Sequence, residues 1–286
     1  MGALYSKSGR VATLHAMYEE ELAVALSLAR QAGARAVAAR SGPFDILHKP
    51  DRSLVTTVDR ELDRFLVDQL RARFPDDAVV GEESVELRDD RGGARRIWFV
   101  DPIDGTTNYV LGIAEFTVLV GLAEAGRPVL GVVVDPEADV AYTAVAGGPA
   151  LKHEAGRPPT PIHASAHETV EGARLVRSVS RRPSASEEYL ARFGVAPPTR
   201  VGSFGLRICR VAEGSADFTY STDFRGGVWD LCGPFAILEA AGGRATDLRG
   251  RPVRLTLRPD DRPMDLLVSN GRLHARLLEV FRDRPR

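Results

Sequence analysis

The chain has 286 residues, of which 44% are hydrophobic and 27% charged, as in an ordinary globular protein. Its 38 basic and 39 acidic residues almost cancel, so overall charge gives no support to a nucleic-acid or membrane-surface partner. No apolar run approaches the roughly 20 residues that cross a bilayer, and residues 1–10 lack the apolar core of a signal peptide. Two cysteines, Cys209 and Cys232, are too few for a disulfide framework. We therefore expect a cytoplasmic protein.

Two helices are predicted near the N-terminus. Residues 15–40 carry apolar side chains at i, i+3 and i+4 spacing, and a Ser-Gly-Pro sequence at 41–43 ends the pattern. Residues 60–74 repeat this spacing before Pro75 closes it. Asp59 stands at the start of the second helix, where an aspartate commonly caps free N–H groups. On position alone, capping is the simplest explanation of Asp59.

A short strand and a charged loop come next. Residues 76–80 lead into the sequence Gly-Glu-Glu at 81–83, whose adjacent carboxylates a solvated turn would explain. Residues 88–96 are charged and contain glycine. Such a segment is equally typical of an inert loop and of a mobile flap beside a site.

The stretch that follows combines a strand, a turn and a helix start. An apolar run at 98–100 predicts a buried strand that Pro102 ends. Gly105 allows the chain to turn, and the threonines after it begin a helix. Asp101 and Asp104 therefore lie at a strand end beside free N–H groups. Such a corner can hold a divalent cation and a phosphate together, which predicts a metal-dependent phosphomonoesterase.

The remaining sequence alternates strands and helices. A hairpin is predicted from residues 116–122 and 129–134, followed by a strand at 139–146 and a loop at 152–166. Further strands are predicted at 174–180, 216–220, 247–253 and 265–269, and helices at 184–193, 205–213, 231–241 and 273–282. A soft boundary near 150 divides the chain into residues 1–150 and 151–286, two halves of one catalytic unit. This alternation indicates an α/β fold of layered sheets and helices.

Five acidic residues stand at the ends of predicted elements: Asp59, Glu82, Asp101, Asp104 and Asp230. Taken singly, each is explained as a cap or a solvated turn. Glu82, Asp101 and Asp230, however, each follow apolar sequence, and a buried carboxylate needs a counter-charge. Few arginines lie close to Asp101 and Asp104 in the sequence. Carboxylates without thiol or imidazole neighbours favour Mg²⁺ over Zn²⁺.

Other chemistries find weaker support. The six histidines are scattered without metal-binding spacing and are assigned to the surface: His15, His48, His153, His163, His167 and His274. No nucleophile-elbow, Walker A or dinucleotide-binding glycine motif is present in the sequence. The sequence Ser-Arg-Arg at 180–182, together with Arg207 and Arg210, could meet an anionic substrate. Solvated arginines are the simpler explanation.

Three of these strings, in this order, carry a family resemblance. The sequence DPIDGTTN at 101–108, GEE at 81–83 and Trp229-Asp230 before a helix ending EAAGG resemble the inositol monophosphatase superfamily. The similarity runs from about residue 49 to residue 243. It implies an αβαβα sandwich of the inositol monophosphatase and fructose-1,6-bisphosphatase type. It also implies Mg²⁺-dependent, lithium-sensitive hydrolysis of phosphate monoesters, and a homodimer.

The resemblance assigns roles to particular residues. Glu82, Asp101 and the Ile103 carbonyl would hold a first metal ion, and Asp101, Asp104 and Asp230 a second, with Glu82 facing a third. Thr106 and Asp59 would orient the water on the first ion for in-line attack. The N–H groups of Gly105 and Thr106 would bind phosphate, and Lys49 matches a family lysine near the metals. No protein nucleophile is required, because the metal ions can activate water.

The substrate is left open between two branches. Substrate contacts are expected at 201–207, including Gly202, Ser203 and Phe204, and at Asp223, where inositol phosphatases often carry a glutamate. The sequences EFT at 115–117, SR at 180–181 and CRVAEG at 209–214 are similar to the 3'(2'),5'-bisphosphate nucleotidase branch. The sequence TNY at 107–109 is more like the inositol branch. Inositol monophosphate or a similar sugar phosphate is the first hypothesis, the bisphosphate nucleotide the second, and a non-catalytic regulatory binding protein the third.

Overall fold

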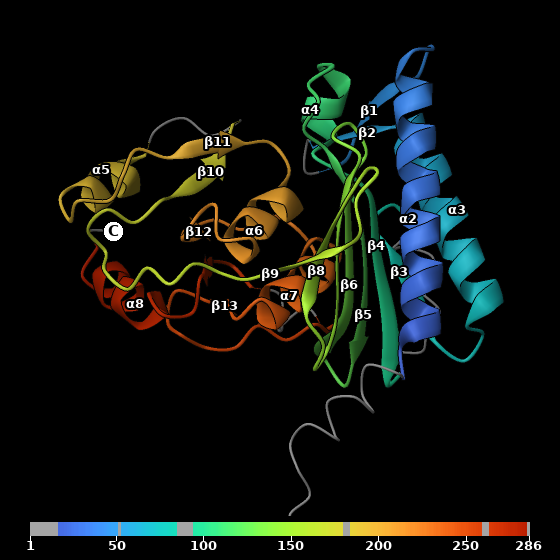
Figure 1. The fold of residues 1–286 in the computed structure, drawn as a ribbon. Coiled ribbons are helices and arrows are strands. Elements are labelled where there is room, and N and C mark those ends of the chain that lie inside the picture. The colour runs from blue at the N-terminus through green and yellow to red at the C-terminus, as the bar shows by residue number, and fades with distance from the viewer. Residues whose placement is uncertain (1–16, 51–52, 85–93, 180–183, 259–262, 285–286) are drawn as a thin grey trace, which may run out of the picture.

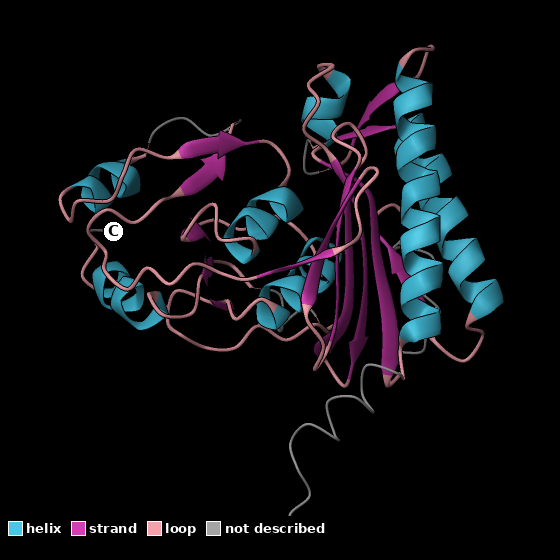
Figure 2. Ribbon diagram, in the orientation of Figure 1, coloured by secondary structure: helices cyan, strands magenta, loops and turns pink. Residues whose placement is uncertain are grey.

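The computed structural model describes residues 17–50, 53–84, 94–179, 184–258 and 263–284. Five layers alternate between helices and sheets across the molecule (Figures 1 and 2). The order is a helix pair, a large sheet, a second helix pair, two small sheets and an outer helix pair. The predicted αβαβα sandwich is therefore confirmed. Residues 1–10, most of the charged loop at 88–96 and the Ser-Arg-Arg sequence at 180–182 lie outside the described residues.

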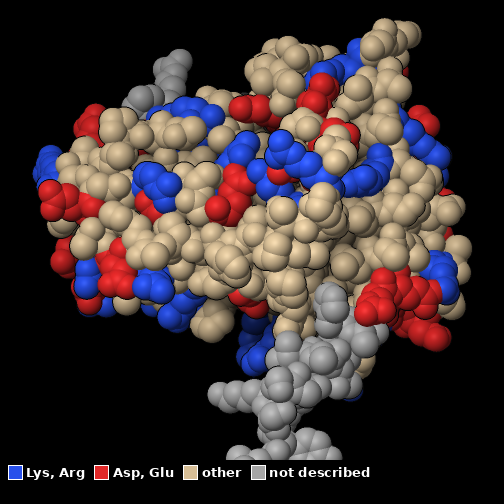
Figure 3. All heavy atoms as spheres, in the orientation of Figure 1, with Lys and Arg blue, Asp and Glu red and all other residues tan. Residues whose placement is uncertain are grey.

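The first two layers hold most of the N-terminal half. Helices α2 (Glu19–Arg40) and α3 (Thr57–Arg73) cover one face of the large sheet. Acidic side chains gather over the first turn of α2 (Figure 3), where the helix dipole favours negative charge. A hairpin of β1 (Ile46–His48) and β2 (Leu54–Thr56) joins the two helices. Neither strand was predicted from the sequence.

The large sheet has seven strands in the order of the chain, β3 to β9. They are β3 (Ala78–Gly81), β4 (Arg96–Asp104), β5 (Thr117–Glu124), β6 (Arg127–Asp135), β7 (Val140–Val145), β8 (Ala150–Glu154) and β9 (Thr160–Ile162). Only β3 and β4 pair in parallel within it. The predicted hairpin is confirmed as β5 and β6. The predicted loop at 152–166 is wrong in part, because β8 and β9 extend the sheet there.

The other three layers come from the C-terminal half. Helices α6 (Phe204–Ala212) and α7 (Trp229–Ala240) form the central pair. Beyond them lie two small sheets: β10 (Val176–Ser178) with β11 (Thr199–Val201), and β12 (Phe218–Ser221) with β14 (Leu266–Ser269) and β13 (Arg244–Thr246). Helices α5 (Ala185–Ala191) and α8 (His274–Arg282) form the outer layer. The strand predicted at 247–253 is wrong, because Asp247 instead closes a turn by accepting the N–H groups of Arg249 and Arg251.

Helix α7 lies very close to the large sheet because glycines face each other at the contact. Gly121 of β5 and Gly131 of β6 are register partners in adjacent strands. A Cβ on Gly121 would lie 2.4 Å from the Gly233 nitrogen, and one on Gly131 would lie 2.0 Å from the Gly233 carbonyl oxygen. Residues 231–238 of α7 are all buried. This contact fixes the height of α7, and therefore of Asp230 in its first turn, above the sheet.

The prediction that all six histidines lie at the surface is wrong for His274. Its ring is fully buried, with Nδ1 2.8 Å from the Ser269 hydroxyl and Nε2 2.9 Å from the Thr246 hydroxyl. The Thr246 hydroxyl donates to the Asp247 carbonyl, so it accepts from Nε2. These partners fit a neutral ring. Burial, helped by the charge of Arg244, lowers the pKa of His274 to about 4.

We expect this histidine to make the fold acid-sensitive. Below the ordinary histidine pKa of 6.5 the unfolded chain takes up a proton that the folded chain refuses until about pH 4. The free energy of unfolding should therefore fall by roughly 3 kcal/mol across that interval. His274→Gln keeps a donor and an acceptor but does not titrate. Urea unfolding between pH 7 and pH 4 should show a flatter profile for the variant, and parallel profiles would contradict the assignment.

No helix among the described residues is long and apolar enough to cross a membrane. On the face in Figure 3, positive and negative side chains lie interspersed over most of the surface. This mixture of charges agrees with the near-zero net charge of the chain.

Candidate metal centre

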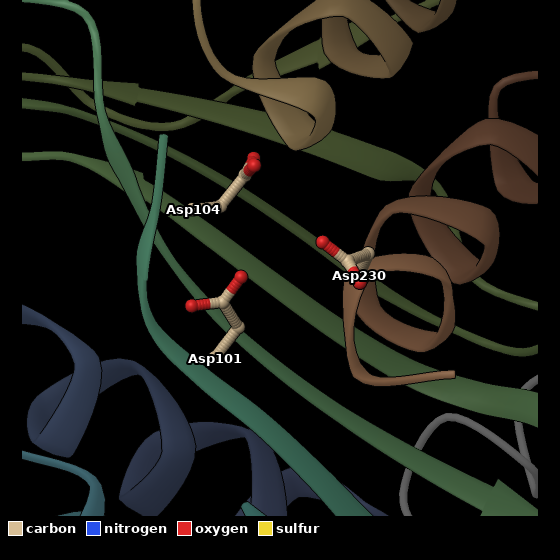
Figure 4. Close-up of side chains that lie close together, drawn as sticks. All are labelled: Asp101, Asp104 and Asp230. Carbon is tan, nitrogen blue, oxygen red and sulfur yellow. The ribbon is translucent and has the colours of Figure 1, made fainter. Parts of the chain in front are cut away.

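The corner at the end of β4 is built as predicted, with one correction. Strand β4 does not end at Pro102 but continues to Asp104, with its register against β5 shifting between Asp101 and Asp104. Gly105 then turns the chain with φ +103° and caps α4 (Thr106–Val110). Only a glycine adopts that backbone conformation without strain. The irregular pairing brings both aspartate side chains to the same edge of the sheet (Figure 4).

Three carboxylates converge at this edge. Asp101 and Asp104 come from β4 and Asp230 from the first turn of α7, and one oxygen of each lies within 4.8 Å of the others. Figure 4 shows the Asp101 and Asp230 carboxylates facing the gap between strand and helix, and Asp104 pointing toward α6. Asp101 is only 2% exposed and Asp104 only 6%. The sequence separates Asp230 from the pair by more than 100 residues, and the fold brings it back.

The negative charges of the clustered carboxylates repel one another. Burial raises the pKa of Asp101 well above its ordinary value, and the nearby charges of Glu82, Asp230 and Asp104 raise it further. Burial likewise raises the pKa of Asp230, with Glu82 and Asp104 adding to the effect. Carboxylates that cannot all ionise together need a cation. A cluster of hard oxygen donors fits Mg²⁺ or a similar divalent ion.

Glu82 stands beside the cluster and is held by Lys49. The Lys49 ammonium lies 2.6 Å from Glu82 and 2.5 Å from Glu83. Burial alone would lower the pKa of Lys49, but both glutamates outweigh it and raise that pKa. Asp63 of α3 supports the turn from behind by accepting the Glu83 N–H at 3.1 Å. A Cβ on Gly81 would lie only 2.0 Å from the Asp63 carboxylate, so the glycine is required there.

Asp59 caps α3, as its position in the sequence suggested, and it also contacts Thr106. Its Oδ2 accepts the Thr56 N–H at 2.8 Å, which completes a capping box at the start of α3. Its Oδ1 accepts the Thr106 hydroxyl at 3.1 Å. The Thr106 hydroxyl also lies 3.1 Å from the Ile103 carbonyl oxygen. The structure thus brings Asp59, Ile103 and Thr106 together at one edge of the acidic cluster.

Asp104 is bound to the start of α6. Its carboxylate accepts the Ser203 hydroxyl at 2.5 Å and the N–H groups of Phe204 and Gly205 at 3.1 and 2.6 Å. The Thr117 hydroxyl of β5 donates to it at 3.2 Å. Ser203 is fully buried, and its position makes it a support for Asp104. Helix α6, about two-thirds of the way along the chain, therefore orients the Asp104 carboxylate of β4.

Two residues of the expected substrate segment, Phe204 and Arg207, line a cavity of about 230 Å³ that borders Asp230. Phe204 of α6 and Phe224 after β12 pack together there, with ring centroids 5.3 Å apart. Arg207 covers the Phe204 ring at 5.0 Å. Asp223 is exposed and accepts from Arg225 at 2.9 Å. Gly202 lies outside the cavity lining and donates its N–H to the Glu115 carboxylate at 2.8 Å.

Sequence reasoning missed Asp63, Thr117 and Arg177. Asp63 lies four residues after Asp59 on the same face of α3, and that spacing could have indicated it. Thr117 and Arg177 carry no such signal, because each meets the site only through the folded chain. Of the arginines weighed as anion contacts, two lie among the described residues: Arg207 lines the cavity, whereas Arg210 pairs with Glu213 at 2.7 Å.

The acidic cluster needs cations, and it lies beside the first turn of a helix whose N–H groups suit phosphate. This is the arrangement of a metal-dependent phosphatase. Sequence comparison agrees with this class. Residues 17–286 match the inositol monophosphatase family, and the chain belongs to that family.

Relatives of both branches are similar to the chain. The 3'(2'),5'-bisphosphate nucleotidase CysQ of Escherichia coli is 34% identical over 243 residues, which cover 81% of this chain and 92% of CysQ. Inositol monophosphatase 3 of Solanum lycopersicum is 32% identical over 256 residues, covering 84% and 90%. The solved structure of an inositol monophosphatase from Thermotoga maritima superposes with a TM-score of 0.76 at 26% identity, covering 92% and 97%. The chain thus shares its fold with a solved inositol monophosphatase and is similar in sequence to members of both branches.

Proposed function

We propose that the acidic corner is the catalytic centre of this phosphatase and that it works with Mg²⁺. Glu82, Asp101 and the Ile103 carbonyl would hold one ion, and Asp101, Asp104 and Asp230 a second. Glu82 would also face a third, weaker ion. The convergence of the Asp101, Asp104 and Asp230 carboxylates, with raised pKa values at Asp101 and Asp230, supports this assignment. When bound, the ions would neutralise the phosphate and acidify the attacking water.

The chain's own groups would orient the reactants. Thr106 donates to Asp59, so its oxygen lone pairs can accept a hydrogen bond from water and fix the direction of attack. The N–H groups of Gly105 and Thr106 at the start of α4 are free of intrahelical partners and would receive the phosphate oxygens. Asp104, whose carboxylate is held by the start of α6, would link the metal centre to the cavity in which the substrate binds. We expect Li⁺ to inhibit.

The cavity beside Asp230 favours a nucleoside 3',5'-bisphosphate as the substrate. Its lining combines an aromatic pair, Phe204 and Phe224, with three arginines, Arg177, Arg207 and Arg225. Aromatic faces suit a base, and guanidinium groups suit a second phosphate. This cavity lining is the single observation that carries the proposal. On this observation the bisphosphate nucleotide ranks ahead of inositol monophosphate, which was the first hypothesis from the sequence.

Inositol monophosphate or a similar sugar phosphate is the second candidate. Asp223 favours it, because an exposed carboxylate at the cavity can accept hydrogen bonds from ring hydroxyls. The likeness to inositol monophosphatase 3 of tomato supports it as well. We further propose that residues 1–150 and 151–286 are two halves of one catalytic unit, and that the protein is a cytoplasmic homodimer.

Phosphate release from adenosine 3',5'-bisphosphate and from inositol 1-phosphate distinguishes these candidates. With Mg²⁺, kcat/KM should be at least about 10-fold higher for the bisphosphate, because the cavity can pair both of its phosphates. Li⁺ should lower either rate. A higher kcat/KM for inositol 1-phosphate would establish the second candidate. Release from neither substrate would refute catalysis and leave a binding protein of this fold.

A further inference from the structure

We propose that Arg177 selects the substrate by pairing with a second phosphate group in the cavity that Arg177 and Asp230 both line. This inference rests on the proposed function and names the residue that gives it its specificity. Arg177 is the middle residue of β10, and only 8% of it is exposed. It nevertheless lines the same cavity as Asp230. A guanidinium in a nearly buried wall, reached through a cavity, is placed to meet an anion.

The guanidinium of Arg177 is held in a fixed orientation. Its Nε donates to the Glu187 carboxylate at 3.2 Å, and its Nη1 donates to the Tyr220 carbonyl. Its plane lies over the Tyr220 ring, 3.9 Å from the centroid. A guanidinium carries five N–H donors. These two contacts use two of them, the single N–H of Nε and one N–H of Nη1. A group oriented in advance loses little entropy when it binds a phosphate.

The carboxylate that holds Arg177 does not bind Arg177 alone. The Glu187 carboxylate is shared between two arginines, Arg177 and Arg200, which lies 2.7 Å from its second oxygen. One carboxylate therefore faces two guanidinium charges. Arg207 lines the cavity as well, and the exposed Asp223 is paired with Arg225. A dianionic group on the substrate would pair with the Arg177 guanidinium in the cavity wall, whereas a neutral sugar hydroxyl would not.

Arg200 offers a matched control. It binds the same Glu187 carboxylate as Arg177, and it also donates to the Ser178 carbonyl at 3.2 Å. It lies on β11, next to β10, but does not line the cavity. Removing either arginine disturbs the same ion-pair network. Only removal of Arg177 takes a charge away from the cavity wall, so a purely structural role predicts equal effects for both.

The test compares adenosine 3',5'-bisphosphate with adenosine 3'-monophosphate in the full-length, Mg²⁺-loaded enzyme. In wild type the ratio of kcat/KM, bisphosphate over monophosphate, should exceed 1. Arg177→Met should lower this ratio by about 10- to 100-fold through KM, the loss expected for a charge-assisted pair. Arg177→Lys should lower it less, because an ammonium keeps the charge without the fork. Arg200→Met should leave the ratio at its wild-type value.

Inhibition by adenosine 5'-monophosphate gives a second readout, since this probe carries only the second phosphate. Its inhibition constant should rise about 10-fold or more in Arg177→Met. If Arg177→Met fails to fold in a thermal melt, Arg177→Lys carries the test with both readouts. A wild-type ratio in the Arg177 variant, or an equal fall in Arg200→Met, would overturn the assignment while leaving the nucleotidase activity standing. If the wild-type enzyme released no phosphate from the bisphosphate, the proposed function would be overturned instead.

Discussion

Asp101→Asn should reduce phosphate release by at least about 1,000-fold while leaving the fold intact. Asp101 is the carboxylate that both proposed ions share, and an amide cannot replace its charge. The substitution should also raise the melting temperature of the metal-free protein. Burial and neighbouring carboxylates raise the pKa of Asp101, so the metal-free fold loses stability as pH rises above the ordinary aspartate range. The neutral amide removes that loss. Calorimetry at neutral pH with and without Mg²⁺ measures both effects.

Asp135→Asn is the matched control for this substitution. Asp135 is also a buried aspartate at the end of a strand, but its carboxylate accepts the Ala138 N–H at 3.1 Å and lies outside the acidic cluster. It should keep the wild-type turnover and the wild-type stabilisation by Mg²⁺. Near-normal turnover in Asp101→Asn would refute the metal assignment. So would a stabilisation by Mg²⁺ as large as that of the wild type.

Gly131→Ala should damage the metal centre from a distance. A Cβ there would lie 2.0 Å from the Gly233 carbonyl oxygen, so α7 must move away from the sheet. Overpacking of this kind costs about 1–3 kcal/mol of unfolding free energy. Because α7 carries Asp230, we also expect about a 100-fold loss of kcat/KM, the effect of an error of about 1 Å in the position of a reacting group. Chemical unfolding and steady-state kinetics measure the two effects separately.

Gly42→Ala provides the comparison for the glycine contact. Its Cβ would meet only the Ala39 carbonyl at 3.6 Å, an ordinary van der Waals distance. Stability and kcat/KM should therefore stay near wild type in this variant. If Gly131→Ala behaved in the same way, the close contact between α7 and the sheet would not determine the position of Asp230.

The layered fold was predictable where local pattern and packing agree. Helix α2 and the hairpin of β5 and β6 follow directly from their apolar spacing and turn residues. The strands β8 and β9 were missed because their composition is that of a loop. Pairing with β7 makes β8 a strand, and pairing with β8 makes β9 one. His274 was assigned to the surface because the histidines are scattered and show no metal-binding spacing. Its burial depends on Ser269 and Thr246, which the sequence alone does not place beside it.

The acidic set was predictable because carboxylates that follow buried strands need a counter-charge, whatever the fold. The prediction that Pro102 ends β4 failed because a bulge lets the strand continue past it. Sequence alone could not show that Asp104 is fixed by α6 or that Arg177 reaches the cavity. Asp104 contacts Ser203 across about 100 residues of sequence. Arg177 shares a cavity wall with Asp230, about 50 residues further along the chain. Such contacts leave no periodic trace in the sequence.

The most direct test of the metal centre is a crystal structure grown with Mn²⁺, which replaces Mg²⁺ in oxygen-ligand sites and scatters anomalously. We expect an anomalous peak between Asp101, Asp104 and Asp230, with carboxylate oxygens within about 2.5 Å of it. A second peak should lie beside Glu82. Well-ordered carboxylates with no anomalous peak among them, at millimolar Mn²⁺, would contradict the account.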